Sequence, residues 1–213
     1  MINEGIKIYN HASNKISMKV LPGHFATSHS HINYFFDMTN LKIRQSEARE
    51  VARAISQQYS YNTVVDTVVC MDGTEVIGAY LADELQSAGI MSLNSHKTIY
   101  VVSPETDNAN QIIFRDNTKI AIENKHVLLL LASATTGRTV MSALDCIRYY
   151  GGRIAGISAL FSAVENVSEY QIHAIFNGTD LPQYNTYAAH DCPMCKEGRA
   201  IDALVNSYGY SVL

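Results

Sequence analysis

The sequence predicts an α/β fold in which a parallel, doubly wound sheet is flanked by helices. Short apolar runs, long enough for buried strands but too short for most helices, occur at residues 64–70, 98–102, 127–131 and 154–161. Between them, apolar residues recur at helical spacing. With 213 residues, 47% of them hydrophobic, the chain is large enough for one such domain with a substantial core. Because strands alternate with helices, the strands are expected to be parallel.

Composition limits the classes of partner. The net charge is −4 and no run is rich in lysine or arginine, which argues against nucleic acid or an anionic membrane surface. No aliphatic run approaches the roughly 20 residues of a membrane-spanning helix. Residues 1–5 are polar and are not followed by the apolar stretch of a signal peptide. Four cysteines in such a chain predict reduced thiols and a cytoplasmic location.

The elements of the first half follow from local patterns. Residues 1–22 have weak periodicity, whereas the β-branched run that begins at residue 64 is typical of a buried strand. The predicted elements are, in order, short strands or an arm around residues 7–9 and 16–21, a polar loop from residue 23, a helix over 43–60, a strand over 64–70 and a helix ending near residue 89.

The polar loop contains three histidines, His24, His29 and His31. Three histidines suggest a metal site. No predicted regular element places them on one face, however, and no carboxylate or cysteine stands near them in the sequence as a fourth ligand. We therefore do not expect a metal there.

The second half continues the alternation of strands and helices. Gly151 and Gly152 form a natural C-terminal stop for a helix. The predicted elements are a strand over 98–102, a hairpin of 111–114 with 119–122, a strand over 127–131, a helix over 138–150, and strands over 154–162 and 171–176.

The most informative stretch is residues 126–140, where an aliphatic strand passes into a loop of small and hydroxylated residues and then into a helix. Such a loop suits a phosphate, because unpaired backbone amides and the helix dipole both favour negative charge at a helix N-terminus. The alternative is a tight turn that joins a buried strand to a crossover helix. The residues expected to bind phosphate are Ser133, Thr135, Thr136, Gly137, Arg138 and Thr139.

The segment Thr135-Thr136-Gly137-Arg138-Thr139 after this strand resembles the phosphoribosyl pyrophosphate motif of type I phosphoribosyltransferases. The resemblance implies that the loop holds a ribose 5′-phosphate. In that family two acidic residues just before the loop hold the ribose hydroxyls, and here those positions are Leu131 and Ala132. The phosphate half of the motif is present and the acidic half is absent.

Residues 23–37 resemble the base-binding loop of orotate phosphoribosyltransferases. Tyr34, Phe35 and Phe36 match its aromatic end, and the resemblance implies that they lie against a pyrimidine base. His29 stands at the family's glycine and Thr27 at its lysine. The alternative is that these aromatics belong to the core.

The loop Met71-Asp72-Gly73-Thr74-Glu75 resembles the pyrophosphate-binding segment of the same family. Asp72 and Glu75 stand where small residues are more usual, and carboxylates beside pyrophosphate would repel it unless magnesium lay between them. The resemblance therefore implies magnesium if the protein is catalytic. Asp72, Glu75 and Asp145 are the acidic residues considered as substitutes for the missing pair.

The resemblance also implies a homodimer, because in the orotate enzymes a basic loop of one subunit covers the site of the other. Here the corresponding residues 103–110 contain two acidic residues and no basic one, so they cannot stabilise a departing pyrophosphate.

Two hypotheses follow. One is a pentosyltransferase of the orotate type, with weak or altered activity on phosphoribosyl pyrophosphate or a nucleotide. The other is a non-catalytic sensor or regulator with the same fold.

The tail contains His190, Cys192 and Cys195, which have the spacing of half a zinc knuckle with a third ligand. The alternative is a reduced turn that caps a helix, since neither Cys70 nor Cys146 is an obvious fourth ligand. A short helix is predicted around residues 201–205. The chain is thus divided into an N-terminal arm and base loop (1–42), an α/β core (43–180) and a tail (181–213), the first and last forming a small hood.

Overall fold

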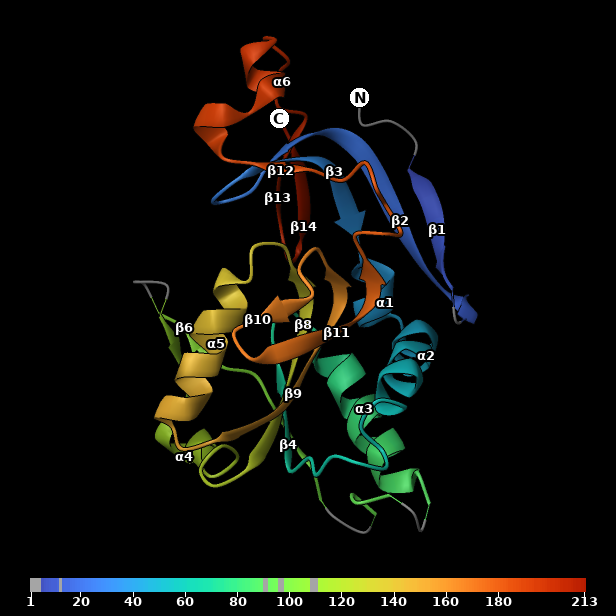
Figure 1. Ribbon diagram of the computed structural model, residues 1–213, viewed down its shortest axis with the longest axis vertical. Helices are drawn as coiled ribbons and strands as arrows, with labels where there is room; N and C mark the ends of the chain where they lie inside the picture. The colour runs from blue at the N-terminus through green and yellow to red at the C-terminus, as the bar shows by residue number, and fades with distance from the viewer. Residues whose placement is uncertain (1–4, 12, 90–91, 96–97, 108–110) are drawn as a thin grey trace.

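The computed structural model describes residues 5–11, 13–89, 92–95, 98–107 and 111–213. It contains two six-stranded sheets, a small hairpin and the helices around them (Figure 1). In Figure 1 one sheet lies above the other. No helix of the described residues is long and apolar enough to span a membrane.

The lower sheet, here called the central sheet, has the strand order β10-β11-β9-β8-β4-β5. All its neighbours pair in parallel except β10, which is antiparallel to β11. The predicted parallel α/β sheet is therefore confirmed, including the four strands on which it rested. The strands are β4 (Thr67–Cys70), β5 (Tyr100–Val102), β8 (His126–Ala134), β9 (Arg153–Ser162), β10 (Asn166–Val167) and β11 (Tyr170–Asn177).

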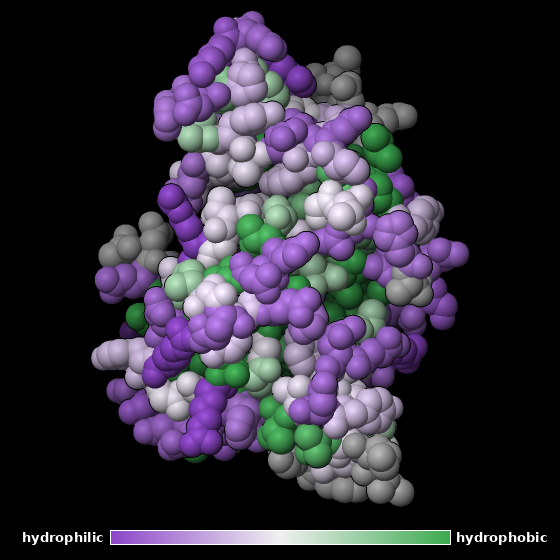
Figure 2. Space-filling model, viewed as in Figure 1, coloured by the Kyte–Doolittle hydropathy of each residue, from purple (hydrophilic) through white to green (hydrophobic). Residues whose placement is uncertain are grey.

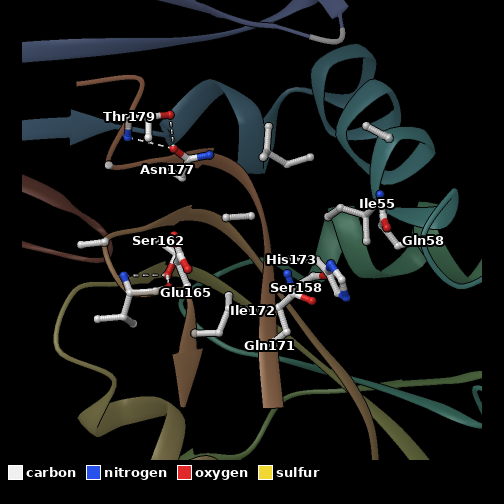
Figure 3. A pocket seen from close by; sticks show the side chains of 16 residues that line it. Ile55, Gln58, Ser158, Ser162, Glu165, Gln171, Ile172, His173, Asn177 and Thr179 are labelled. Carbon is white, nitrogen blue, oxygen red and sulfur yellow. Dashed lines mark hydrogen bonds between the residues drawn. The ribbon is translucent and has the colours of Figure 1, made fainter. Parts of the chain in front are cut away.

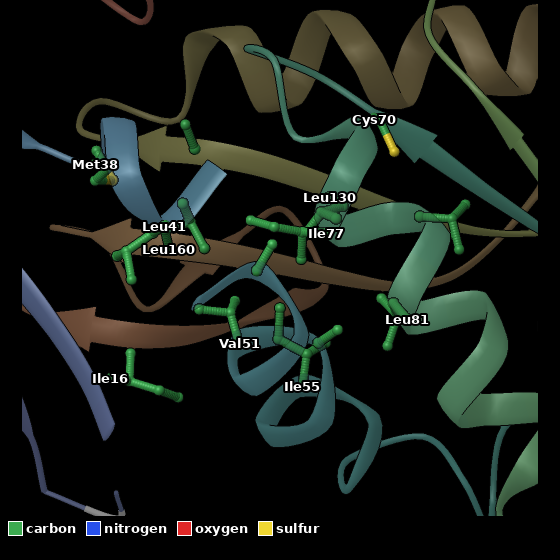
Figure 4. Packing of buried hydrophobic residues seen from close by; sticks show 14 of the residues in the cluster. Ile16, Met38, Leu41, Val51, Ile55, Cys70, Ile77, Leu81, Leu130 and Leu160 are labelled. Atoms are coloured by element: carbon green, nitrogen blue, oxygen red, sulfur yellow. The ribbon is translucent and has the colours of Figure 1, made fainter. Parts of the chain in front are cut away.

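Strand β8 lies in the middle of this sheet and is buried on both faces. Its even-numbered residues Leu128 and Leu130 pack in one hydrophobic cluster with α2 (Gln45–Ser56) and α3 (Glu75–Ser87). Its odd-numbered residues Val127, Leu129 and Leu131 pack in a second cluster with α5 (Arg138–Tyr149). Figure 4 shows the first cluster, where Leu130 lies among side chains of both helices. A strand covered by helices on both faces needs apolar residues at every position, which explains the unbroken aliphatic run.

The upper sheet, here called the hood sheet, joins segments from both halves of the sequence. Its order is β12-β3-β2-β13-β14, with β1 also paired to β2. The long β2 pairs antiparallel with β3 and in parallel with β13, so residues 203–204 lie beside residues 25–26. The strands are β1 (Ile6–Asn10), β2 (Ser13–Ala26), β3 (His31–Asp37), β12 (Thr186–Tyr187), β13 (Ala203–Asn206) and β14 (Gly209–Val212).

Three local predictions are wrong. Residues 201–205 do not form a helix, because Ala203 to Asn206 alternate between buried and exposed, which is the period of a strand. Residues 111–114 do not pair with 119–122; instead β7 (Ile112–Ile113) pairs with β6 (Glu105–Thr106). Residues 23–37 are not mainly a loop, since β2 continues to Ala26 and β3 starts at His31.

Short helical turns complete the fold. They are α1 (Thr39–Ile43), α4 (Asp116–Lys119), η1 (Ala189–Asp191) and α6 (Pro193–Lys196). Part of the acidic segment at 103–110, namely residues 108–110, lies outside the described residues.

Candidate functional site

A cavity of about 470 Å³, here called the candidate cavity, lies between the hood sheet and the carboxyl ends of β4 and β8. Ligands bind at this edge in open parallel sheets, because the loops after neighbouring strands converge there. The hood sheet contributes the opposite wall. The lining includes residues 27–30, 133–140, 186–188 and 205–207, together with Phe35, Phe36, Lys42, Asp72 and Tyr184.

The six residues predicted to bind phosphate all line this cavity. Strand β8 ends at Ala134 and α5 begins at Arg138, so the loop leads directly into the helix N-terminus, where the first-turn amides have no intrahelical acceptor. Gly137 is the N-cap, with a φ of 75°. A Cβ added there would lie 2.8 Å from Cγ2 of Val167. The left-handed conformation and this close approach both explain the glycine.

Asp72 is the one carboxylate among the described lining residues, and it comes from the end of β4. Asp72 and Gly73 have φ values of 60° and 76°, which turn the chain sharply toward α3. The Asp72 carboxylate accepts hydrogen bonds from the Ser207 side chain and from the backbone of Ala132 and Ser133. Burial nevertheless outweighs these bonds and raises the pKa of Asp72 above its ordinary value.

The position of this carboxylate bears on the missing acidic pair. Leu131 and Ala132 are buried in the two hydrophobic clusters, and neither offers a polar side chain to a ligand. Asp72 instead brings a carboxylate from the neighbouring strand to the backbone of Ala132. The other two acidic candidates do not line the cavity: Glu75 accepts a hydrogen bond from the Ser103 hydroxyl (2.7 Å), and Asp145 pairs with Arg148 (3.7 Å).

Lys42 supplies a cation to the same cavity. Its side chain is buried, and its Nζ donates to the backbone oxygen of Asp72 (2.9 Å) and to that of Ser207. Burial lowers the pKa of Lys42, while the nearby carboxylates of Asp72, Glu75 and Asp37 act in the opposite direction. Lys42 thus connects α1, the loop after β4 and the β13–β14 turn.

The predicted base-binding aromatics divide between cavity and core. Phe35 and Phe36 line the cavity. Phe36 also stacks on Phe161, with ring centroids 3.9 Å apart, so it serves the core as well. Tyr34 is not among the lining residues, and its hydroxyl donates to Oε1 of Gln183 (3.1 Å).

Tyr184 is a lining residue that the sequence did not single out. Its hydroxyl is buried and has no hydrogen-bond partner among the described residues. Burial raises its pKa to about 12, so it is a protonated donor at neutral pH. A buried hydroxyl without a partner is unfavourable, so Tyr184 is well suited to bind a polar ligand atom.

The remaining residues of the predicted pyrophosphate loop lie outside the cavity lining. Thr74 is buried, and its hydroxyl donates to the backbone oxygens of Met71 (2.8 Å) and Leu130 (3.3 Å). Thr74 therefore supports the loop that carries Asp72. Thr27, which stands at the family's lysine position, also has a structural role. Its Oγ1 accepts hydrogen bonds from the backbone amides of His29 (3.2 Å) and Ser30 (2.9 Å) in the β2–β3 turn.

A second cavity, of about 550 Å³, lies between α2 and the strands β9 and β11 (Figure 3). Its described lining includes Glu165 and His173 but neither lysine nor arginine, and it contains none of the predicted site residues. Without a cation or a helix N-terminus it is less suited to a phosphate than the candidate cavity.

The tail cysteines lie beside two of the N-terminal histidines. Cys192 and Cys195 form a cluster with His24 and His31. His190, expected as a third ligand, is outside this cluster, and its Nε2 lies 3.1 Å from the Asp191 carboxylate. No cysteine is near these histidines in the sequence, and we therefore expected no cysteine ligand. In the folded chain two cysteines do lie beside them, because β3 pairs with β12 in the tail. His29 belongs to the cavity lining instead.

Comparison with known proteins points to one fold. No protein-family profile matches the chain. The curated orotate phosphoribosyltransferase of Chlorobaculum parvum is 23% identical over 193 residues, covering 89% of this chain and 90% of that protein. The crystal structure of Mycobacterium tuberculosis orotate phosphoribosyltransferase has a TM-score of 0.53 at 14% identity, covering 77% of this chain and 92% of the other.

A third similar protein, Leishmania donovani UMP synthase, has a TM-score of 0.54 at 16% identity, and the match covers 84% of this chain and 36% of that one. The chain therefore has the type I phosphoribosyltransferase fold and is a phosphoribosyltransferase-like protein.

Proposed function

We propose that the candidate cavity binds phosphoribosyl pyrophosphate or a nucleotide, and that the protein transfers phosphoribose to a pyrimidine-type base resembling orotate. The observation that carries the proposal is the meeting, in one cavity, of a phosphate loop, a carboxylate and aromatic rings. In this proposal the loop of residues 133–139 binds the phosphate and Asp72 binds the ribose. Phe35 and Phe36 lie against the base. The orotate phosphoribosyltransferase of C. parvum, which aligns over most of this chain, supports the choice of reaction.

Each group has a defined task in this reaction. As the bond from ribose to pyrophosphate breaks, positive charge develops on the ribose and negative charge on the leaving group. Asp72 is placed to accept from a ribose hydroxyl and to offset the first charge. Lys42 and Arg138 are the lysine and the arginine of the described cavity lining. Their positive charges would stabilise the 5′-phosphate and the departing pyrophosphate.

Magnesium fits this donor set. It is usually held by one or two carboxylates together with phosphate oxygens, and Asp72 is the carboxylate that lines the cavity. Magnesium would reduce the repulsion between Asp72 and a pyrophosphate group.

A specific observation also supports a non-catalytic sensor as the second candidate. Leu131 and Ala132 are each 1% exposed and belong to the core, so two carboxylates of the family have no counterpart at their own positions. On the hairpin that follows β5, Glu105 is paired with Arg115 (2.6 Å) on the surface rather than presented to the cavity. Binding with little turnover would follow from these features.

Calorimetry combined with an orotate-consumption assay separates the two candidates. We expect phosphoribosyl pyrophosphate to bind, with higher affinity when magnesium is present, and a nucleoside monophosphate to bind without it. We also expect turnover well below the ~10 per second of an ordinary enzyme. Binding with no orotate consumption would favour the sensor. If neither ligand binds, the proposal fails in both forms.

Arg138→Met and Asp72→Asn test the assigned ends of the ligand separately. Arg138→Met should lower the affinity for inorganic phosphate only modestly, because backbone amides and hydroxyls make many of the expected contacts with it. Asp72→Asn should leave phosphate affinity near wild type and weaken the ribose-containing ligands by roughly 10-fold or more, since a charge-assisted hydrogen bond contributes about 1.5–3 kcal/mol. If Asp72→Asn instead lowered the affinity for inorganic phosphate and left the affinity for ribose-containing ligands unchanged, the assignment of Asp72 to the ribose end would be wrong. Arg148→Met, outside the cavity, is the matched control for the arginine.

The same proposal includes a homodimer that acts in the cytoplasm. The edge strand β5 and the adjoining α3 expose Tyr100 and Val76, apolar side chains suited to burial against a second copy. Light scattering at micromolar concentration should give twice the 23.6 kDa chain mass. Tyr100→Lys should shift the mass toward the monomer, whereas Tyr149→Lys should not, because Tyr149 is an exposed tyrosine on α5 rather than on β5 or α3. A monomeric wild type would contradict the dimer.

A further inference from the structure

Four potential metal ligands converge where the β2–β3 hairpin meets the C-terminal tail. His24 lies on β2 and His31 begins β3, while Cys192 is the N-cap of α6 and Cys195 lies within that helix. One ligand atom from each of the four lies within 4.8 Å of all the others. Figure 1 shows α6 above the end of the hood sheet where these segments meet.

Two of the distances between these atoms equal those around a tetrahedral zinc ion, and two are a few tenths of an ångström shorter. His24 Nε2 lies 3.0 Å from His31 Nδ1 and 3.6 Å from each of the sulfurs of Cys192 and Cys195. Cys195 Sγ lies 3.2 Å from His31 Nδ1. Zinc bonds of ordinary length at tetrahedral angles place two nitrogens about 3.3 Å apart and a nitrogen and a sulfur about 3.6 Å apart.

The surroundings of His24 fix the ring in the tautomer that a metal requires. Its Nδ1 donates to the backbone oxygens of Arg199 (2.9 Å) and Ala200 (3.1 Å). Nε2 then carries the lone pair and faces the other three ligands. A second ring nitrogen bonded to a carbonyl is the usual outer-shell arrangement of a zinc-bound histidine.

Hydrogen bonds alone do not account for this convergence. His24 Nε2 has a single lone pair, yet three polar atoms approach it. His24 and Cys192 are both completely buried, so water does not compensate. A cation at the centre of the four atoms satisfies all of them together.

The tail around the cysteines lacks a hydrophobic core of its own. Of residues 189–200, only Cys192 and Met194 are buried, and neither belongs to a hydrophobic cluster of the fold. Figure 2 shows the corresponding end of the molecule as predominantly hydrophilic. Segments of this kind are commonly held in place by a metal rather than by apolar packing.

We propose that His24, His31, Cys192 and Cys195 bind one structural zinc ion, which joins the N-terminal hairpin to the C-terminal tail. All four positions are occupied by protein ligands, as in structural rather than catalytic zinc sites. The turn between the two histidines, residues 27–30, forms part of the wall of the candidate cavity. The zinc therefore also holds that wall in place.

Metal analysis of the reduced full-length chain tests the site. We expect one zinc per chain after purification from zinc-containing medium. Cobalt exchanged for zinc should show the visible bands of a tetrahedral ion together with thiolate charge-transfer bands. Cys192→Ser and Cys195→Ser should each weaken zinc binding by more than the ~10–100-fold typical of an outer-shell change.

Matched controls separate the cluster from other thiols and histidines. Cys146→Ser and His190→Ala should keep one zinc per chain, since Cys146 lies on α5 and His190 lies outside the cluster. His31→Cys should keep cobalt and strengthen the thiolate bands, a readout that remains if a serine variant fails to fold.

Two results would overturn the site. One is wild-type protein that takes up neither zinc nor cobalt under reducing conditions. The other is full zinc occupancy in the Cys192→Ser/Cys195→Ser double variant. Because these measurements use no phosphoribosyl ligand, they are independent of the proposed function.

Discussion

At the scale of single residues, Gly137 shows how one missing Cβ shapes the phosphate loop. Gly137→Ala places a side chain in the left-handed region and against Val167, at a cost of roughly 1–2 kcal/mol for the backbone alone. We expect lower stability in urea and weaker inorganic phosphate binding by calorimetry. Gly178→Ala is the control, because an added Cβ there meets nothing within 4 Å. Equal stability and affinity in the two variants would contradict this account.

Asp72 gives stability a defined dependence on pH. Its pKa is raised in the folded chain above the ordinary value of 3.8, so between 3.8 and the raised value the folded state holds more protons than the unfolded state. The free energy of unfolding contributed by this group is therefore highest below 3.8 and falls as pH rises through that window. Asp72→Asn should remove this fall. Urea denaturation of both proteins across the window measures the difference in slope, and parallel curves would contradict the prediction.

At the scale of elements, Tyr59 connects the end of α2 to the central sheet. Its buried hydroxyl bonds to the backbone oxygen of Ile157 (3.1 Å) and to the Ser158 hydroxyl (2.8 Å) on β9. Tyr59→Phe leaves both buried partners without this bond, and we expect a loss of about 1–3 kcal/mol in urea denaturation. Tyr61→Phe, at a side chain that is 63% exposed, should change stability little. An equal effect of the two substitutions would be inconsistent with a role for the buried bonds.

The elements also show which parts of the fold local sequence can predict. Strand β8 was predictable because burial on both faces requires an unbroken aliphatic run. The helix predicted around residues 201–205 is wrong, since Ile201, Leu204 and Val205 alone cannot distinguish a period of two from one of 3.6. The strand is set by pairing with β2, which is distant in the sequence. The burial of Lys42 and the contact of His24 with Cys192 could not be predicted from local sequence patterns either, because the partners of both residues are distant in the sequence.

At the scale of the whole molecule, Lys42 joins the hood sheet to the central sheet. Lys42→Met removes the donor shared by the backbone oxygens of Asp72 and Ser207. Leaving such acceptors unsatisfied costs about 1–3 kcal/mol, partly offset by the lost burial of a charge. We expect lower stability in urea and weaker binding of phosphoribosyl pyrophosphate. Lys15→Met, at an exposed lysine paired with Glu50 on the surface, is the control. Unchanged ligand affinity in Lys42→Met would exclude this lysine from the site.

The pairing of β2 with β13 has a consequence for the order in which the protein forms. Domains fold in part during synthesis, beginning with segments that leave the ribosome early. Residues 13–26 emerge early, but their parallel neighbour at 203–206 emerges only after every strand of the central sheet. The nascent chain therefore carries the end of β2, residues 25–26, without its parallel partner while the central sheet completes. The cavity between the two sheets closes as the final step, so a chain interrupted before residue 203 has the phosphate loop but no enclosed site.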